Sequence, residues 1–501
     1  MFLLPNSLLR SVHRFRSSLA AASFLTTLAT TTFLPAAEKP QWTRLMPAGA
    51  TAGASTPVDA SGTFTSWPVQ IWCSHPGVHW KCLEKAGSFE VSVNAGVRDQ
   101  VAWVRLYNEA GATPAKPFYV SPRATKTEKE PNDRILEVTE TLHDNEVTYG
   151  LLEKNGDVDH YRLALRAGEP FSATLDATRS LRSPLDAHLQ LLDERGFVLT
   201  ENLDRYGYDP GIAFQPKKDG TYYLRVFGFP VEPDSTISFR GGADWCYRLQ
   251  WQRSQLPFDA FNAEGILLPS VAPEGPSPTS KDSAATVSLP LDTQRAILHN
   301  KETHFYRIQN LGGKSLEIQL LAQSIGSYLD ATLTITNKEG KQVSFQDDDK
   351  TNRDPKLVWQ VPDNEEYWVS VSDFHKLGSE DRVYRLQIRE RLTSLLATAP
   401  AELKESKANE EFEWSIALER INNWTGDVEV LGVGLPADAV LTNTQFAVTK
   451  DGPKAHAVKV KLPTPWQGPF ALQLKLAGIE TPVTVAGPTQ AGVWISNVVT
   501  K

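Results

Sequence analysis

The chain has 501 residues and a formal net charge of −8 at pH 7, with 59 acidic against 51 basic side chains. This balance, without a basic stripe that would neutralise phosphates, argues against a nucleic-acid ligand. The length allows three or four domains. The 33 Pro and 32 Gly beside only two Met favour short strands and many turns over long helices.

The N-terminus is predicted to be an export signal, residues 1–37. Three arginines precede an uncharged run that ends in two alanines, which is typical of a cleaved secretory signal. An uncleaved anchor is the alternative, because the run is about long enough to span a bilayer; its five threonines favour cleavage. We expect a mature chain without a membrane span that is secreted, periplasmic or held at the cell surface.

Two stretches in the middle of the chain match one another. "HYRLALRAGEPFSATL" from residue 160 matches "FYRIQNLGGKSLEIQL" from residue 305, which places Tyr161 over Tyr306. "DPGIAFQPKKDGTYYLRV" matches "DPKLVWQVPDNEEYWVSV" in the same order, and both copies close with "YRLQ". The sequence therefore contains two copies of one module.

The pattern within each copy predicts strands. "DAHLQLLD" and "DATLTITN" alternate apolar and polar residues as a half-buried strand does. Segments such as "GTYYLRVFGF" are aromatic and β-branched, and turn sequences separate them. We expect an all-β protein of tandem antiparallel β-sandwich domains, Ig-like and jelly-roll-like.

The ordered motifs "EPND", "GDVDHYRL", "SPLDAHLQLLDERG" and "DPGIAFQPKKDGTYYLRV" resemble the bacterial pre-peptidase C-terminal (PPC) domain. This β-sandwich module is commonly attached to secreted proteases and is related to the collagen-binding domains of bacterial collagenases. The resemblance covers 128–252 well and 286–390 less completely, because the second copy has no EPND. A β-rich module placed before EPND also resembles exported multidomain proteins of planctomycete type.

These observations divide the chain into five parts after the signal. They are an Ig-like domain (38–123), a first PPC-like sandwich (124–254), a Pro- and Ser-rich linker (255–285), a second, degenerate PPC-like sandwich (286–391) and a C-terminal sandwich (392–501).

Two other motifs contain potential metal ligands. In "CSHPGVHWKC" we expect a disulfide between Cys73 and Cys82, because export leads to an oxidising compartment; a zinc site that includes the two histidines is the alternative. "DDDK" followed by "NRD" lacks the Gly and Glu of an EF-hand loop. We interpret it as a solvated turn, although its Asp354 aligns with Asp209 of the first copy.

The EPND segment is the strongest candidate site. Calcium takes six to eight oxygen ligands from carboxylates and carbonyls, and the resemblance to collagenase modules implies a calcium site here. The implied ligands are Glu128, Glu130, Asn132, Asp133, Asp157 and Asp159. The alternative is that EPND is merely the solvated start of a domain.

The second copy serves as an internal comparison. There "KETHFY" replaces "GDVDHY", which places Lys301 and Thr303 where Asp157 and Asp159 stand. We therefore expect one calcium site rather than two.

No HExxH, GxSxG or GxxxxGK[ST] motif occurs in the sequence, so we expect no enzymatic activity. The sequence favours an exported binding or scaffolding protein of the cell surface or extracellular space. Its expected partner is an extracellular protein or a polysaccharide. The alternatives are an accessory chain of a secreted protease or other hydrolase, and a structural spacer.

Overall fold

The computed structural model describes residues 38–144, 146–229, 239–255, 276–349, 353–391, 395–421, 423–488 and 491–498. The predicted export signal (1–37) and residues 256–275 of the predicted linker lie outside these ranges. No helix in the described ranges is long and apolar enough to cross a membrane.

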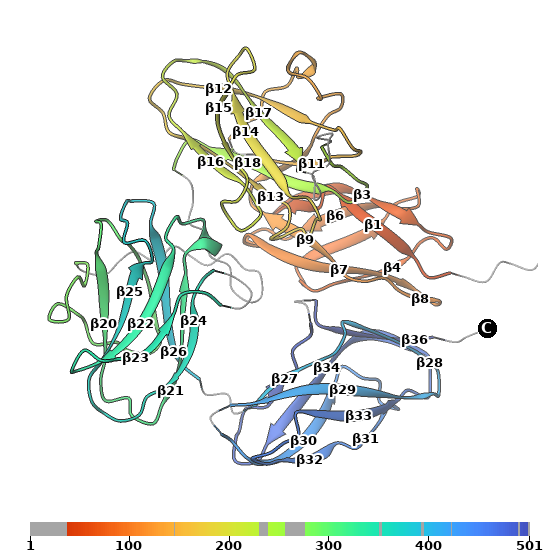
Figure 1. The fold of residues 1–501 in the computed structure, drawn as a ribbon. Helices are drawn as coiled ribbons and strands as arrows, with labels where there is room; N and C mark the ends of the chain where they lie inside the picture. Colours follow the sequence, from red (N-terminus) through yellow and green to blue (C-terminus); the bar gives the residue numbers. More distant parts are fainter. Residues whose placement is uncertain are drawn as a thin grey trace, which may run out of the picture. The chain divides into compact units, whose positions relative to one another are not determined.

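Regular structure in the described residues is almost entirely β-strand, with two short 3-10 helices, so the predicted all-β class is confirmed (Figure 1). The strands form antiparallel sheets with three parallel pairings between named strands, β2–β9, β10–β11 and β28–β36. This architecture follows from the alternating apolar pattern, because each sheet must bury one face against another layer.

Nine strands of the first described stretch form two sheets, ordered β1-β3-β6-β5 and β2-β9-β7-β4, with β8 paired to β7. The strands are β1 (Gln41–Met46), β2 (Gly49–Thr51), β3 (Ser55–Thr63), β4 (Gln70–Cys73), β5 (Val78–Cys82), β6 (Ser88–Val93), β7 (Gln100–Asn108), β8 (Gly111–Ala112) and β9 (Lys116–Ser121).

Residues 124–252, called the first repeat below, form the sheets β10-β11-β18-β13-β16 and β12-β17-β14-β15. The elements are β10 (Ala124–Thr127), η1 (Ile135–Glu137), β11 (Glu146–Leu151), β12 (Asp159–Leu165), β13 (Phe171–Asp176), β14 (Ala187–Leu192), β15 (Val198–Asn202), β16 (Gly211–Phe214), β17 (Gly220–Gly228) and β18 (Cys246–Gln252).

Residues 276–390, the second repeat, form the sheets β19-β26-β21-β24 and β20-β25-β22-β23. The elements are β19 (Leu291–Ala296), β20 (Thr303–Ile308), β21 (Ser315–Leu321), η2 (Gln323–Ile325), β22 (Ala331–Asn337), β23 (Gln342–Gln346), β24 (Lys356–Gln360), β25 (Tyr367–Asp373) and β26 (Val383–Glu390).

The remaining strands form the sheets β27-β29-β33-β31 and β28-β36-β34-β30-β32, with β35 paired to β34. They are β27 (Leu395–Thr398), β28 (Leu403–Lys407), β29 (Glu411–Arg420), β30 (Gly426–Val433), β31 (Val440–Thr442), β32 (Gln445–Val448), β33 (Ala455–Lys461), β34 (Trp466–Leu476), β35 (Val483–Thr484) and β36 (Val493–Val498).

The two repeats share strand order and register. Tyr161 of β12 pairs with Leu224, and Tyr306 of β20 pairs with Val369 at the same place in the second repeat. Each repeat also has a register irregularity at the same point of its outer hairpin, β14–β15 and β22–β23. The first repeat adds β10, which leads into the EPND segment.

The core of the first repeat lies between its two sheets and includes Leu163, Leu189, Leu224 and Tyr247. Strand β14 differs from the prediction of a half-buried strand, because all six of its residues are buried. Its outward-facing His188 and Gln190 are covered by neighbours on the same face: the ring of His188 packs against Phe227, and Gln190 contacts Arg225.

Candidate metal centre in the first repeat

The backbone of the first repeat places Glu128 at the end of β10. This strand runs parallel to β11, and the Glu128 amide continues the ladder by donating to the Tyr149 carbonyl oxygen (2.9 Å). The side chain then turns inward, where Oε1 accepts a hydrogen bond from the Leu151 amide (2.5 Å). Strand β11 thus holds Glu128 through both its backbone amide and its carboxylate.

Two buried tyrosines join Glu128 to Asp159. Tyr161 donates to Glu128 Oε2 (3.0 Å), and the Tyr161 and Tyr247 hydroxyls lie 2.5 Å apart. Tyr247 donates in turn to Asp159 Oδ2. The tyrosines come from β12 and β18, which belong to opposite sheets of the sandwich, so the polar chain crosses the core.

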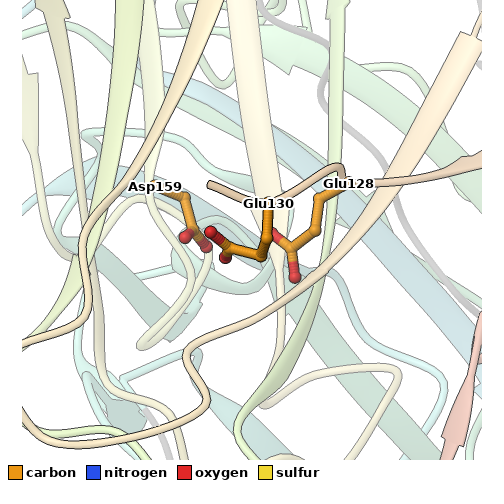
Figure 2. A group of neighbouring side chains, drawn as sticks. All are labelled: Glu128, Glu130 and Asp159. Atoms are coloured by element: carbon orange, nitrogen blue, oxygen red, sulfur yellow. The ribbon is translucent and has the colours of Figure 1, made fainter. Parts of the chain in front are cut away.

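Three carboxylates converge at this end of the sandwich. Glu128, Glu130 and Asp159 each offer one oxygen, and these oxygens lie within 4.8 Å of one another. Figure 2 shows the three side chains pointing toward one another. Asp159 is fully buried, and its Oδ1 has no hydrogen-bond partner in the structure. This is the only such group of His, Cys, Asp or Glu among the described residues.

Asn132, two residues after Glu130, carries a buried side-chain amide. The residue is 3% exposed, and neither its Oδ1 nor its Nδ2 has a hydrogen-bond partner in the structure. Its backbone is tied down, because its amide donates to Glu130 Oε2 (3.0 Å) and its carbonyl oxygen accepts from the His160 amide (3.0 Å). A buried polar group without a partner costs about 1–3 kcal/mol. A cation bound at Asn132 Oδ1 would offset part of this cost.

The other two implied ligands lie outside the three-carboxylate group. Asp157 is buried and accepts a hydrogen bond from the Glu153 amide (2.5 Å) through Oδ2. Asp133 is exposed, and its Oδ1 accepts weakly from the Val158 amide (3.4 Å). The structure therefore groups three of the six implied ligands, sets Asn132 next to Glu130, and gives Asp133 and Asp157 backbone partners of their own.

Burial raises the pKa of each grouped carboxyl. The pKa of Glu128 rises to about 7, mainly through burial and further through the charge of Glu130. Burial and the charge of Glu128 raise the pKa of Asp159 well above its ordinary value, and the pKa of Glu130 is also raised. Such shifts mean that negative charge is disfavoured here unless a cation balances it.

Nearby lysines do not supply that balance. Lys126 and Lys129 flank Glu128 in the sequence, but their ammonium groups pair with Glu146 (2.7 Å) and Glu140 (3.3 Å). Oxygen-only donors with two unpartnered oxygens, on Asp159 and Asn132, fit a hard divalent cation such as Ca²⁺.

The second repeat corrects one alignment made from the sequence. The β-pairing places His304, not Thr303, at the position of Asp159, because His304 pairs with Val371 as Asp159 pairs with Val226. Glu302, not Lys301, therefore follows as the counterpart of Asp157. The alignment of Tyr161 with Tyr306 gives the same correspondence.

This correction changes the reason for expecting one site. His304 Nδ1 lies 2.6 Å from the Tyr384 hydroxyl and its Nε2 lies 2.8 Å from Glu302 Oε1. The Tyr306 and Tyr384 hydroxyls keep the tyrosine pair at 2.6 Å. Pro278 provides the carbonyl oxygen that Asn132 provides in the first repeat. An imidazole thus completes the second network where the first presents carboxylates.

The tyrosine pair is the part of the site that sequence reasoning missed. Its signal was present, because Tyr161 and Tyr247 both align with tyrosines of the second copy. A hydroxyl buried at matching positions of two copies indicates a shared hydrogen bond rather than core packing alone.

The solvated-turn interpretation of the "DDDK…NRD" segment is wrong for Asp354. This residue is 3% exposed, and it accepts hydrogen bonds from the backbone amides of Ala322 (2.9 Å), Gln323 (2.7 Å) and Ser324 (3.1 Å). Asp209 does the same in the first repeat through the amides of residues 177–179. This aspartate is a structural acceptor of the fold, which explains its presence in both copies.

The predicted disulfide is not formed. Cys73 and Cys82 are free thiols in the structure. Cys73 ends β4 in one sheet, whereas Cys82 ends β5 in the other and donates to the Val69 carbonyl oxygen (3.4 Å). The thiol of Cys246 is also free, and it is buried.

The residues of the zinc alternative do not form a metal-binding group: among the described residues, only Glu128, Glu130 and Asp159 do so. His75 Nδ1 accepts a hydrogen bond from the Gly77 amide (3.0 Å), and His79 Nε2 lies 3.3 Å from Asn94 Oδ1. Each imidazole therefore has a local partner of its own.

Solved structures that match the chain do so at low similarity. The D0-D1 domain of intimin is 8% identical, with 41% of this chain and 97% of that chain covered and a TM-score of 0.16. The fibronectin(III)-like modules of Clostridium thermocellum CbhA are 10% identical, with 42% and 94% covered and a TM-score of 0.15. The Clostridium perfringens ZmpB structure, an M60 catalytic domain with two CBM51 domains, is 12% identical, with 68% and 54% covered and a TM-score of 0.15. TM-scores this low carry no inference about function.

No curated protein matches the chain. A family model does: residues 157–228 match the bacterial pre-peptidase C-terminal domain. The match begins at Asp157 and ends with β17, so it includes Asp159 and Tyr161 of the centre described above. The first repeat is thus similar to this family over the strands that carry Asp159, one of the three grouped carboxylates.

Proposed function

We propose that this chain is an exported, non-catalytic binding or scaffolding protein whose first repeat holds one structural Ca²⁺. The observation that carries the calcium proposal is the meeting of three carboxylates, one of them fully buried; the buried Asn132 amide, whose atoms have no partner in the structure, lies two residues from Glu130 in the chain. The family match over 157–228 supports the role of an accessory module rather than a catalytic one. An extracellular protein or polysaccharide is the proposed partner.

The proposed ligands are Glu128, Glu130, Asp159 and the Asn132 amide oxygen. The ion would balance charge in a region where burial disfavours it, and it would hold the EPND segment against β12. Because Glu128 and Asp159 come from different sheets, the ion would also stabilise the sandwich. Asp133 and Asp157 remain candidates for a ligand shell completed by water.

The test is calorimetric titration of Ca²⁺ into the full chain stripped with a chelator. The Asp159→Asn variant keeps the shape of the side chain but removes its charge, and we expect it to lose the binding heat. Glu339→Gln, at an exposed turn of the second repeat, is the matched control and should bind as wild type. The absence of heat in the wild-type chain at millimolar Ca²⁺ would rule the site out.

Export needs a separate experiment. We expect fractionation of source cells to place the chain outside the cytoplasm, with its N-terminus beginning after the predicted signal. A cytoplasmic chain that retains residue 1 would contradict this part of the proposal.

A further inference from the structure

The outer face of the sheet β20-β25-β22-β23 carries an unusual row of side chains. The inward residues of these strands, including Tyr306, Val369 and Leu333, belong to the core, so alternation turns their neighbours outward. Register places Phe305 opposite Ser370, Ser370 opposite Thr334, and Thr334 opposite Phe345. A phenylalanine thus stands at each end of two hydroxyl residues.

This row is accessible and lacks charge. Phe345 on the edge strand β23 is 44% exposed, and Phe305, Ser370 and Thr334 are each half-buried. With strands about 4.8 Å apart, the row extends about 14 Å across the sheet. It is therefore a flat, neutral platform with an aromatic ring at either end, long enough for a short run of sugar rings.

Hydroxyl groups on this face have unused hydrogen-bonding capacity. Ser370 donates to the Thr334 carbonyl oxygen (3.3 Å), whereas the Thr334 hydroxyl has no hydrogen bond to the described residues. The Thr336 hydroxyl, two residues along the same face, is buried and also lacks a partner in the structure. A hydroxyl can donate once and accept twice, so the half-buried Ser370 and Thr334 hydroxyls can still pair with a ligand rich in hydroxyls, whereas the buried Thr336 hydroxyl cannot reach one.

The first repeat fills the same row in a different way. There the four positions are His160, Arg225, Gln190 and Glu201. Arg225 donates to Gln190 Oε1 (2.7 Å) and Gln190 donates to Glu201 Oε2 (2.5 Å). That row satisfies its own charges and hydrogen bonds, so the sandwich does not require the neutral row of the second repeat.

The cations around the neutral row are engaged. Arg307 pairs with Glu366 (3.7 Å), Lys376 donates to Ser372 Oγ (3.3 Å), and Lys281 lies 4.4 Å from the centre of the Trp368 ring. Each of these cations thus has a partner within the fold, and the row itself contains no charged side chain. A row of this kind suits an uncharged ligand.

We propose that this face of the second repeat binds a neutral polysaccharide that crosses the strands along Phe305, Ser370, Thr334 and Phe345. A pyranose ring has an apolar C–H face that packs on an aromatic ring and hydroxyls at its edge that pair with Ser and Thr. The proposal rests on the binding role proposed above and names its ligand class. The alternative is that β23, the edge strand of this sheet, pairs with a second copy of this chain and that Phe345 lies in that interface.

The experiment measures sedimentation of the full chain with insoluble chitin and cellulose, and retardation by a soluble neutral glucan, at low and high salt. We expect binding to at least one of them, unchanged by salt because the ligand is uncharged. Phe345→Ala should weaken binding about tenfold or more, as for an aromatic anchor. Phe197→Ala, which removes a 62% exposed ring from the first repeat, should leave it unchanged.

A second variant keeps the result interpretable. Ser370→Arg introduces the residue that the first repeat carries at this position, so it should fold and still abolish polysaccharide binding. Binding to none of the three glycans, or equal binding by Phe345→Ala, would overturn the proposal. The proposal would also be overturned if the chain bound no glycan but formed a concentration-dependent dimer that Phe345→Ala dissociates. Calcium titration of the same preparations reports separately on the proposed function.

Discussion

Replacement of Glu128 by Gln should raise the free energy of unfolding when calcium is absent and lower it, relative to wild type, when calcium is bound. Without a cation, burial favours the protonated form of this carboxyl, so the folded state has to carry a disfavoured charge at high pH. Glu128→Gln removes that charge and keeps an oxygen that can accept from the Leu151 amide. We expect the variant to be more stable than wild type at pH 8 in chelator.

The size of the effect follows from the pKa. A rise from 4.5 to about 7 corresponds to about 3 kcal/mol. A raised carboxyl pKa contributes stability that is complete below the unfolded value and is lost as pH rises through the folded value. Stability of the metal-free wild type should therefore fall between about pH 4.5 and pH 7, and the gain from Glu128→Gln should be absent at pH 4 and about 1–3 kcal/mol at pH 8.

The assay is urea denaturation of wild type, Glu128→Gln and the control Glu339→Gln at three pH values, each with chelator and with saturating Ca²⁺. With Ca²⁺ the order should reverse, because the ion stabilises only the chain that keeps its carboxylate. A variant that is less stable than wild type at pH 8 in chelator would refute the argument that uncompensated charge at Glu128 destabilises the fold. The same order with and without Ca²⁺ would refute its role as a ligand.

Three further predictions concern residues away from the carboxylate group. Asp354→Ala removes the buried acceptor of three backbone amides and should cost about 3 kcal/mol in urea denaturation, whereas a similar loss from the exposed Asp348→Ala would contradict the assigned role. Tyr384→Phe removes the hydroxyl that contacts His304 and Tyr306, and should lower the free energy of unfolding by about 1–3 kcal/mol; no change would show that this network is not stabilising. Alkylation of the unfolded, unreduced chain should label all three cysteines; labelling of only one would show that a disulfide forms.

The fold class was predictable because the alternation of apolar residues and the turn sequences are local signals. The repeat was visible for the same reason, since Tyr161 and Tyr306 sit in matching strand patterns. The counterpart of Asp159 was displaced by one residue, to Thr303, although the alignment of Tyr161 with Tyr306 gives His304; strand pairing fixes the same correspondence and shows which side chain points inward.

The candidate site was only partly predictable from the sequence. EPND and "GDVDHY" supplied the ligand types, but the choice of Asp159 over Asp157 depends on which carboxylate the strand turns into the core. The role of Asp354 was hidden because a buried acceptor of three amides looks, in sequence, like any acidic turn. The expected bond between Cys73 and Cys82 is not formed, because spacing in the sequence does not show how the two strand ends are oriented; the Cys82 thiol donates to the Val69 carbonyl oxygen instead.

The number of calcium ions bound per chain tests the central claim most directly. Equilibrium dialysis of the full chain against Ca²⁺, followed by elemental analysis, should give one ion for wild type and none for Asp159→Asn. We predict a single ion because the first repeat presents carboxylates where the second presents His304. No bound ion in wild type, or an ion that Asp159→Asn retains, would contradict the account.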